Sequence, residues 1–198
     1  MSDTGGLAAM KTLIRKYAMP GTVLLLLLAI VASAPRTAAQ DQPARPRMVI
    51  TLDAGKVVVE LRPDKAPKHV ARIRELANAG FYDGLTVVRV QAGKVVQAGD
   101  PNFDGNGGSG QKIKAEFGDL PHLRGTVGMA RDEDPDSADS QFYICLADWP
   151  KLNGRYTVFG QVVSGMELLD TLAPGDGPMG FITDRSKQPR IVSVRVSE

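Results

Sequence analysis

The chain has 198 residues, with 24 Lys and Arg against 22 Asp and Glu, two histidines and a single cysteine. This length suits one domain with an extra segment, or at most two small domains. One cysteine excludes an internal disulfide and a cysteine-based metal site. The near balance of charge excludes the large basic face that nucleic-acid binding needs.

The first 39 residues differ in composition from the rest. A basic region around Lys11, Arg15 and Lys16 is followed by an apolar run over residues 23–32 and by small residues that end at Ala39. This order is typical of a secretory signal peptide, and the run is short for a membrane span, which needs about 20 apolar residues. We expect a signal peptide over residues 1–39, with cleavage after Ala34 or a retained N-terminal anchor as alternatives.

This segment also sets the charge and the location that we expect. It holds four of the basic residues and one acidic residue, so residues 40–198 carry 20 basic and 21 acidic residues. A protein with such a leader is periplasmic or secreted, or membrane-anchored if the segment is retained. Residues 40–47, polar and containing two prolines, are expected to form a flexible leader before a single domain at 48–198.

The domain begins with a hairpin pattern and a helix pattern. Runs rich in Val and Ile at 48–52 and 56–61 flank a turn that ends at Gly55. Pro67 suits the first turn of a helix and Gly80 suits its end. The residues that recur at helical spacing between them are Val70, Ile73, Leu76 and Ala77.

The rest of the sequence predicts six further short strands and one short helix. The strands are expected at 86–90, 95–98, 126–131, 141–146, 157–163 and 191–196, and the helix at 166–172. Eight short strands are typical of an all-β barrel. Two helices then remain to plug the ends of the barrel.

Three segments, in order and in register, resemble the cyclophilin family. They cover residues 81–100, 125–144 and 152–166, and they begin FYDGLTVVRV, GTVGMA and LNGRYTVFG. The match extends from about Val49 to Val196. The resemblance implies a closed eight-stranded antiparallel barrel capped by a helix at each end, with a substrate groove on its outer face. It also implies peptidyl-prolyl cis-trans isomerase activity without a cofactor or a metal.

The resemblance assigns roles within that groove. Arg89 stands at the family's catalytic position, where a charged guanidinium with several donors would stabilise the twisted amide. Tyr143 would form the floor of a proline pocket, with Leu152 and Val95 as walls. The substrate-binding positions are Val95, Gln97, Met129, Ala130, Gln141, Tyr143, Leu152 and Tyr156. Of the two glutamines, Gln97 would hold the arginine or bond substrate, and the other would bond the substrate backbone.

Several positions depart from the family pattern. Lys94 and Val95 replace phenylalanine and methionine, and would make one side of the proline pocket less apolar. Arg131 replaces asparagine, and would add a cation that competes with Arg89 for substrate groups. Lys151 replaces the tryptophan that contacts cyclosporin, which predicts weak cyclosporin binding. The remaining exchanges are Val88 and Tyr156 for histidine, and Tyr143 for phenylalanine.

The sequence leaves one alternative function open, a non-catalytic proline-binding chaperone or adaptor that uses the same groove. Expected partners are proline-containing peptides and unfolded exported proteins, and the protein is expected to be a monomer. No nucleic-acid partner is expected, and no membrane contact unless the anchor is retained.

The remaining motifs do not indicate other ligands. The glycine-rich loop 100–110 lacks a phosphate-binding pattern and the acidic loop 132–139 lacks EF-hand spacing. His69 and His122 are expected at the surface, and Cys145 in the core.

Overall fold

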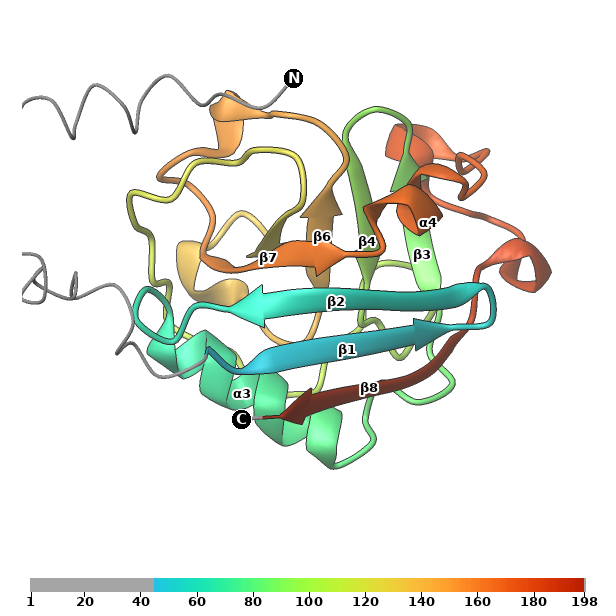
Figure 1. Cartoon of the computed structure of the whole chain (residues 1–198). Helices are drawn as coiled ribbons and strands as arrows, with labels where there is room; N and C mark the ends of the chain where they lie inside the picture. Colours follow the sequence, from blue (N-terminus) through green and yellow to red (C-terminus); the bar gives the residue numbers. More distant parts are fainter. Residues whose placement is uncertain (1–44, 198) are drawn as a thin grey trace, which may run out of the picture. The chain divides into compact units, whose positions relative to one another are not determined.

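The computed structural model describes residues 45–197, so the expected signal peptide and most of the leader lie outside the described residues. The described part is an all-β domain with one eight-stranded antiparallel sheet and two α-helices (Figure 1). The strands are β1 (Arg47–Leu52), β2 (Gly55–Leu61), β3 (Val87–Gln91), β4 (Val95–Ala98), β5 (Thr126–Met129), β6 (Phe142–Cys145), β7 (Val158–Ser164) and β8 (Ile191–Ser197). The helices are α3 (Pro67–Asn78) and α4 (Met166–Asp170). Neither helix is long and apolar enough to cross a bilayer.

The sheet is curled but open, which corrects the expected closed barrel. Its strand order is β3-β4-β6-β5-β7-β2-β1-β8, so β3 and β8 are its edges. Among the described residues the two edges meet only where the two strands begin, around an isolated bridge between Thr86 and Arg190. Gly84 N–H donates to Ile191 O there at 2.9 Å. No ladder continues from that point along the two strands.

The open edge of β3 is covered by residues 175–182 instead of by β8. Gly175 N–H donates to Val90 O at 3.0 Å, and Ile182 N–H donates to Val88 O at 2.9 Å. Phe181 forms an isolated antiparallel bridge with Arg89. A covered edge cannot pair with another chain, and here the covering loop also reaches the strand that carries the predicted catalytic arginine.

Strands β4 and β6 are buried on both faces. Val96 and Ile144 point into the main core inside the curl of the sheet. Val95, Tyr143 and Cys145 form a smaller apolar cluster on the opposite face. Cys145 is a free, buried cysteine, as predicted, and burial raises the pKa of its thiol to about 12. The outer cluster is the base on which the groove described below is built.

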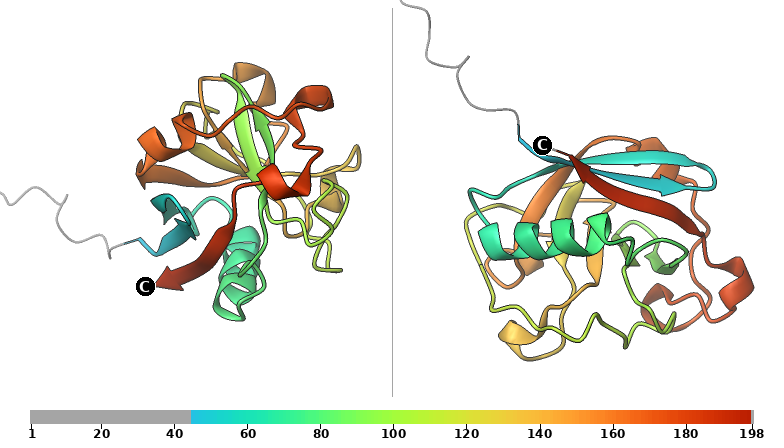
Figure 2. Two further views of the ribbon diagram at one scale, coloured as in Figure 1. Left: turned by 90° about the vertical axis from the view of Figure 1, so that its right-hand side faces the viewer. Right: turned by 90° about the horizontal axis from the view of Figure 1, so that it is seen from below.

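Helix α3 packs against β8 (Figure 2) and is capped from a distant loop. Its own N-terminal side chains supply no cap. The Glu116 carboxylate instead accepts the backbone N–H groups of Lys68 and His69, each at 3.1 Å. The His69 ring is fully buried and its Nδ1 lies 2.7 Å from the same carboxylate. The expectation of a surface histidine was wrong here, because His69 lies on the buried face of the helix.

Candidate active site

The register of three neighbouring strands places the predicted site residues in one row. Arg89 on β3 pairs with Gln97 on β4, and Gln97 pairs with Tyr143 on β6. Tyr143 pairs in turn with Gly128 on β5. Directly paired residues point to the same face of a sheet. The row therefore lies on the outer face, above the small apolar cluster.

A groove of about 440 Å³ runs along this row. It is lined by Arg89, Val95, Gln97, Gly105, Ala130, Arg131, Tyr143, Trp149, Leu152, Tyr156, Met179 and Phe181. Seven of the nine residues predicted for the site are among them. The two exceptions are Gln141, which lines an adjoining pocket, and Met129, which is 1 % exposed and packs in the main core. Met129 differs from expectation because alternate residues of β5 face opposite sides of the sheet.

The Arg89 guanidinium is fixed by three oxygen atoms. Nε donates to Met179 O at 2.8 Å, one terminal nitrogen to Gln97 Oε1 at 3.2 Å, and the other to Gln91 Oε1 at 2.6 Å. The ring of Phe181 lies 5.4 Å from the guanidinium carbon. Burial lowers the pKa of Arg89 below its ordinary value, but an arginine stays charged at neutral pH.

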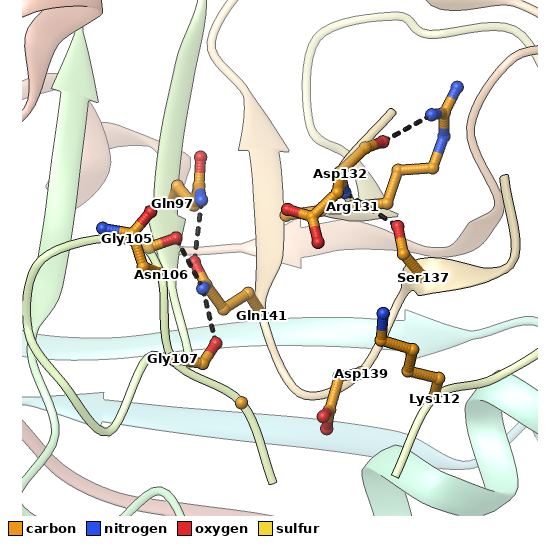
Figure 3. Close-up of a pocket in the computed structure, with 12 residues that line it drawn as sticks. Gln97, Gly105, Asn106, Gly107, Lys112, Arg131, Asp132, Ser137, Asp139 and Gln141 are labelled. Carbon is orange, nitrogen blue, oxygen red and sulfur yellow. Dashed lines mark hydrogen bonds between the residues drawn. The ribbon is translucent and has the colours of Figure 1, made fainter. Parts of the chain in front are cut away.

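Two hydrogen-bonded side-chain amides, of Gln141 and Gln97, set the orientation of the Gln97 acceptor (Figure 3). Gln141 Nε2 donates to the carbonyls of Gly105 and Gly107, at 2.9 and 2.8 Å. Since carbonyls only accept, the Oε1 of Gln141 must face the other way, and it accepts from Gln97 Nε2 at 2.8 Å. The Oε1 of Gln97 is thereby turned toward Arg89. The carbonyls of the glycine-rich loop thus orient the acceptor that Gln97 presents to Arg89.

The far end of the groove is aromatic. Tyr143 and Tyr156 meet edge to face, with ring centroids 5.8 Å apart. Trp149 and Leu152 pack against the same cluster. Lys94 does not line the groove; its ammonium group lies over the Trp149 ring at 5.4 Å. Trp149 therefore supplies an apolar wall on the side where the sequence predicted a less apolar pocket.

Arg131 lines the groove as a wall with few free donors. Its guanidinium stacks over the Tyr156 ring at 4.5 Å. Its nitrogens donate to the backbone carbonyls of Asp132, Glu133 and Arg155 at 2.7 to 3.2 Å. Donors directed at the protein's own carbonyls do not reach a substrate. The structure therefore gives no support to the expected competition with Arg89 for substrate groups.

A smaller pocket of about 150 Å³ adjoins the groove (Figure 3). The two cavities share Gln97, Gly105, Ala130 and Arg131. The remaining lining of the pocket is polar and comes from Asn106, Gly107, Gly108, Lys112, Asp132, Ser137, Asp139 and Gln141. A peptide in the groove could therefore extend a neighbouring side chain into polar surroundings.

Three residues that contact Arg89 were not predicted from the sequence: Gln91, Met179 and Phe181. Arg89 and Met179 are 90 positions apart in the chain, and no local pattern predicts that contact. A weak signal was the glycine at 105, which has a φ of +93° and carries no side chain where the Phe181 ring packs. Among residues 45–197, no group of three or more His, Cys, Asp or Glu is arranged to hold a metal ion.

Comparisons with known proteins agree with this geometry. The family model for cyclophilin type peptidyl-prolyl cis-trans isomerases matches residues 47–196. A probable peptidyl-prolyl cis-trans isomerase of Brucella suis is 44 % identical over 160 residues, which cover 75 % of this chain and 81 % of that protein. Peptidyl-prolyl cis-trans isomerase B of Bacillus subtilis is 45 % identical over 126 residues, covering 63 % and 87 %.

Solved structures are similar as well. A cyclophilin type peptidyl-prolyl cis-trans isomerase of Cryptosporidium parvum, determined in the presence of the dipeptide Ala-Pro, has a TM-score of 0.69 and 26 % identity. The match covers 77 % of this chain and 99 % of that one.

Proposed function

The chain belongs to the family of cyclophilin-type peptidyl-prolyl cis-trans isomerases and is an enzyme of that type, and we propose that it isomerises X-Pro bonds of exported proteins in the groove between Arg89 and Tyr143. The observation that carries the choice of groove is the single row of Arg89, Gln97 and Tyr143 on adjacent strands. It sets a fixed cation at one end and an aromatic floor at the other.

The reaction requires a twisted amide. The barrier to rotation is about 18–20 kcal/mol because the peptide bond loses its resonance. In the twisted state the prolyl nitrogen gains a lone pair, which a charged hydrogen-bond donor stabilises more than it stabilises either planar state. No bond is made or broken, so the protein needs only a pocket for the proline ring and a donor at the nitrogen.

Arg89 is equipped to be that donor. A guanidinium has five N–H groups, and its contacts within residues 45–197 use three of them. One N–H on each terminal nitrogen is left for a substrate. The three acceptors hold the group in place before the substrate arrives, so little reorganisation is needed during the reaction.

The aromatic end would bind the proline ring. Tyr143, Trp149 and Leu152 line it, and an apolar ring gains from burial against such surfaces. The Cryptosporidium parvum relative was solved in the presence of Ala-Pro, which makes this dipeptide the simplest ligand to test. Proline-containing segments are accordingly the substrates that we propose.

The proposed role in export rests on residues 1–39. They have the composition of a signal peptide, and their structure is outside the described residues. A proline isomerase located outside the cytoplasm would act on proteins that fold after translocation, when slow X-Pro isomerisation limits folding.

Isomerase activity is tested by NMR exchange on an Ala-Pro peptide, which needs no coupled protease. Arg89→Ala should reduce the catalysed rate by about 100-fold, as expected for loss of a transition-state donor. Arg47→Ala is the control, because Arg47 is exposed on β1 outside the groove. A folded Arg89→Ala protein with the parent's rate would overturn the proposed role of Arg89.

Export is tested separately by cell fractionation and N-terminal sequencing. A periplasmic or secreted product that begins at Gln40 would support cleavage after Ala39. A cytoplasmic product that retains residues 1–39 would refute the export proposal and leave the enzyme activity untouched.

A further inference from the structure

His122 lies beneath the groove and bonds to the segments that form its floor and two of its walls. The ring is fully buried and does not line the groove. Its Nε2 is 2.8 Å from the hydroxyl oxygen of Tyr143, the groove floor. Its backbone carbonyl accepts from Trp149 N–H at 2.8 Å, and its backbone N–H donates at 2.7 Å to the side chain of Asn153, which follows Leu152. The sequence-based expectation of a surface residue was wrong for His122 too.

Asn153 determines which nitrogen of the His122 ring carries the proton. The backbone N–H of His122 can only donate, so the Asn153 atom that it meets is the amide oxygen. That oxygen also lies 3.1 Å from His122 Nδ1, which must then carry the hydrogen. Burial lowers the pKa of His122 and keeps the ring neutral. The other ring nitrogen, Nε2, is therefore an acceptor, and the Tyr143 hydroxyl donates to it.

The Tyr143 hydroxyl occupies a site made for it. A Cβ atom at Gly128 would lie 2.5 Å from the hydroxyl oxygen, so the absence of a side chain there provides the space. Burial raises the pKa of Tyr143, so the phenol keeps its proton. The rings of His122 and Tyr143 are stacked, with centroids 6.0 Å apart and an angle of 19°. Together these contacts hold the hydroxyl on the side away from the groove.

We infer that His122 is a positioning residue for the isomerase site, because it takes the hydroxyl hydrogen bond of Tyr143 and so leaves only the aromatic face of Tyr143 toward the proline pocket. The hydroxyl lies on the axis of the phenol ring, so it can find another partner only if the whole ring moves. A buried hydroxyl without a partner is costly, and the neighbouring groove is the nearest open space. Loss of His122 should therefore disturb the pocket floor.

A substitution of His122 should therefore change KM chiefly when residue 143 carries a hydroxyl. The test measures kcat and KM for an Ala-Pro peptide by NMR exchange, with the full chain, at a temperature where every variant is folded. His122→Leu should raise KM about tenfold and leave kcat nearly unchanged, because the floor binds the proline ring equally in planar and twisted states. His122→Gln, whose amide oxygen can accept the same bond, should stay within about threefold of the parent in KM.

The decisive variant is the double substitution Tyr143→Phe with His122→Leu. It removes both partners of the bond, so no polar group is left unsatisfied, and KM should return to within about twofold of Tyr143→Phe alone. A purely structural role for His122 predicts the same change in KM with tyrosine or phenylalanine at the floor. That result, or an unchanged KM in His122→Leu, would overturn the inference. The parent's own rate in the same assay tests the isomerase function independently.

A measurement on the unaltered protein covers the case in which His122→Leu does not fold. The ¹⁵N chemical shifts of the His122 ring should show a proton on Nδ1 and an accepting Nε2, and the Tyr143 hydroxyl proton should exchange slowly enough to be seen. A ring protonated at Nε2, or a hydroxyl in fast exchange with water, would refute the proposed arrangement whatever the activity of the enzyme.

Discussion

The two ends of the groove are held in place by different forces. At the polar end, the charged Arg89 guanidinium is fixed by the hydrogen bonds that it donates to Gln91, Gln97 and the Met179 carbonyl. At the aromatic end, packed rings form a floor, and the hydrogen bond of the floor lies beneath it, at His122. The first end suits the lone pair that develops on the prolyl nitrogen only during the reaction, and the second suits a ring that is bound throughout. Changes at the polar end should therefore alter kcat, and changes at the aromatic end should alter KM.

Cations occur at both ends, and they differ in what their donors and charges meet. The Lys94 ammonium lies over the Trp149 ring, and the Arg131 guanidinium lies over the Tyr156 ring. Arg89 alone has both a position in the row and N–H groups left over. The sequence shows three similar cations near one site, and the structure separates them by what their donors meet.

The largest effect should come from Arg89→Lys, which keeps the charge and removes the planar fork. A lysine ammonium at this position cannot bond the three acceptors of Arg89 and the prolyl nitrogen at the same time. We expect kcat to fall by about 30-fold to 100-fold with little change in KM. The measurement is NMR exchange at saturating and subsaturating Ala-Pro peptide. A kcat near that of the parent would show that charge alone suffices at the polar end.

Trp149→Ala is the matching change at the aromatic end. Removal of the indole takes away a wall of the groove, and burial of aromatic surface contributes about 1.5–3 kcal/mol per side chain. We expect KM to rise about tenfold while kcat stays within about twofold. Trp149→Phe serves as the control, since it keeps most of the apolar wall. A fall in kcat as large as the rise in KM would contradict the division between the two ends.

Gln91→Leu should have a moderate effect through Arg89. It removes the acceptor of the shortest of the three bonds, at 2.6 Å, and keeps a side chain of similar size. We expect kcat to fall by about three-fold to five-fold, since one of several orienting contacts is lost. Gln91→Glu keeps an acceptor at that site and should retain more activity than Gln91→Leu. Equal rates for the two variants would mean that this contact does not position Arg89.

Lys94→Phe should have a smaller effect, and in the opposite direction. The lysine reaches the pocket only through Trp149, so an aromatic ring there should make the wall more apolar and raise kcat/KM by about twofold. Peptide titration and the exchange assay measure the binding and rate components. An unchanged or lower kcat/KM would refute the idea that Lys94 weakens the site.

Stability and kcat should respond differently to pH: the stability of the fold should fall in acid, while kcat should stay flat near neutral pH. Burial lowers the pKa of both His69 and His122 below the ordinary 6.5, against the opposing pull of Glu116 on the first and Asn153 on the second. Below pH 6.5 the unfolded chain binds protons that the folded chain resists, so stability is lost as the pH falls toward and through the folded pKa values. Thermal unfolding should therefore give a lower Tm at pH 5 than at pH 7.5.

Glu116 contributes with the same sign. Burial opposes its ionisation, but hydrogen bonds from His69 and from the backbone at the start of α3 hold its pKa below the usual value. Its contribution is present above the unfolded pKa and is lost as the pH falls through the folded one. By contrast, kcat between pH 6 and 8 should stay flat, because the partners of Arg89 do not titrate there. A kcat that follows a histidine titration would contradict this picture of the polar end.

Much of the fold could be predicted from the sequence because the signals are local. The Val-rich runs gave the strands, and Pro67 and Gly80 bounded helix α3 as expected. Seven of the predicted site residues line the groove. Four of them, Arg89, Val95, Gln97 and Tyr143, lie on strands, where residues alternate between the two faces of the sheet. Closure of the barrel was not predictable in this way, since it depends on whether the two edge strands meet along their length.

The sequence by itself determined the element types, the family and the residue types in the row from Arg89 to Tyr143. Tertiary structure decided what holds them: the Met179 carbonyl, Gln91, the glycine-loop carbonyls behind Gln141, and His122 under the floor. These contacts join segments far apart in the chain through loops whose paths no periodicity specifies. A histidine or glutamine looks the same in a sequence whether it faces water or a buried partner, and only packing distinguishes the two.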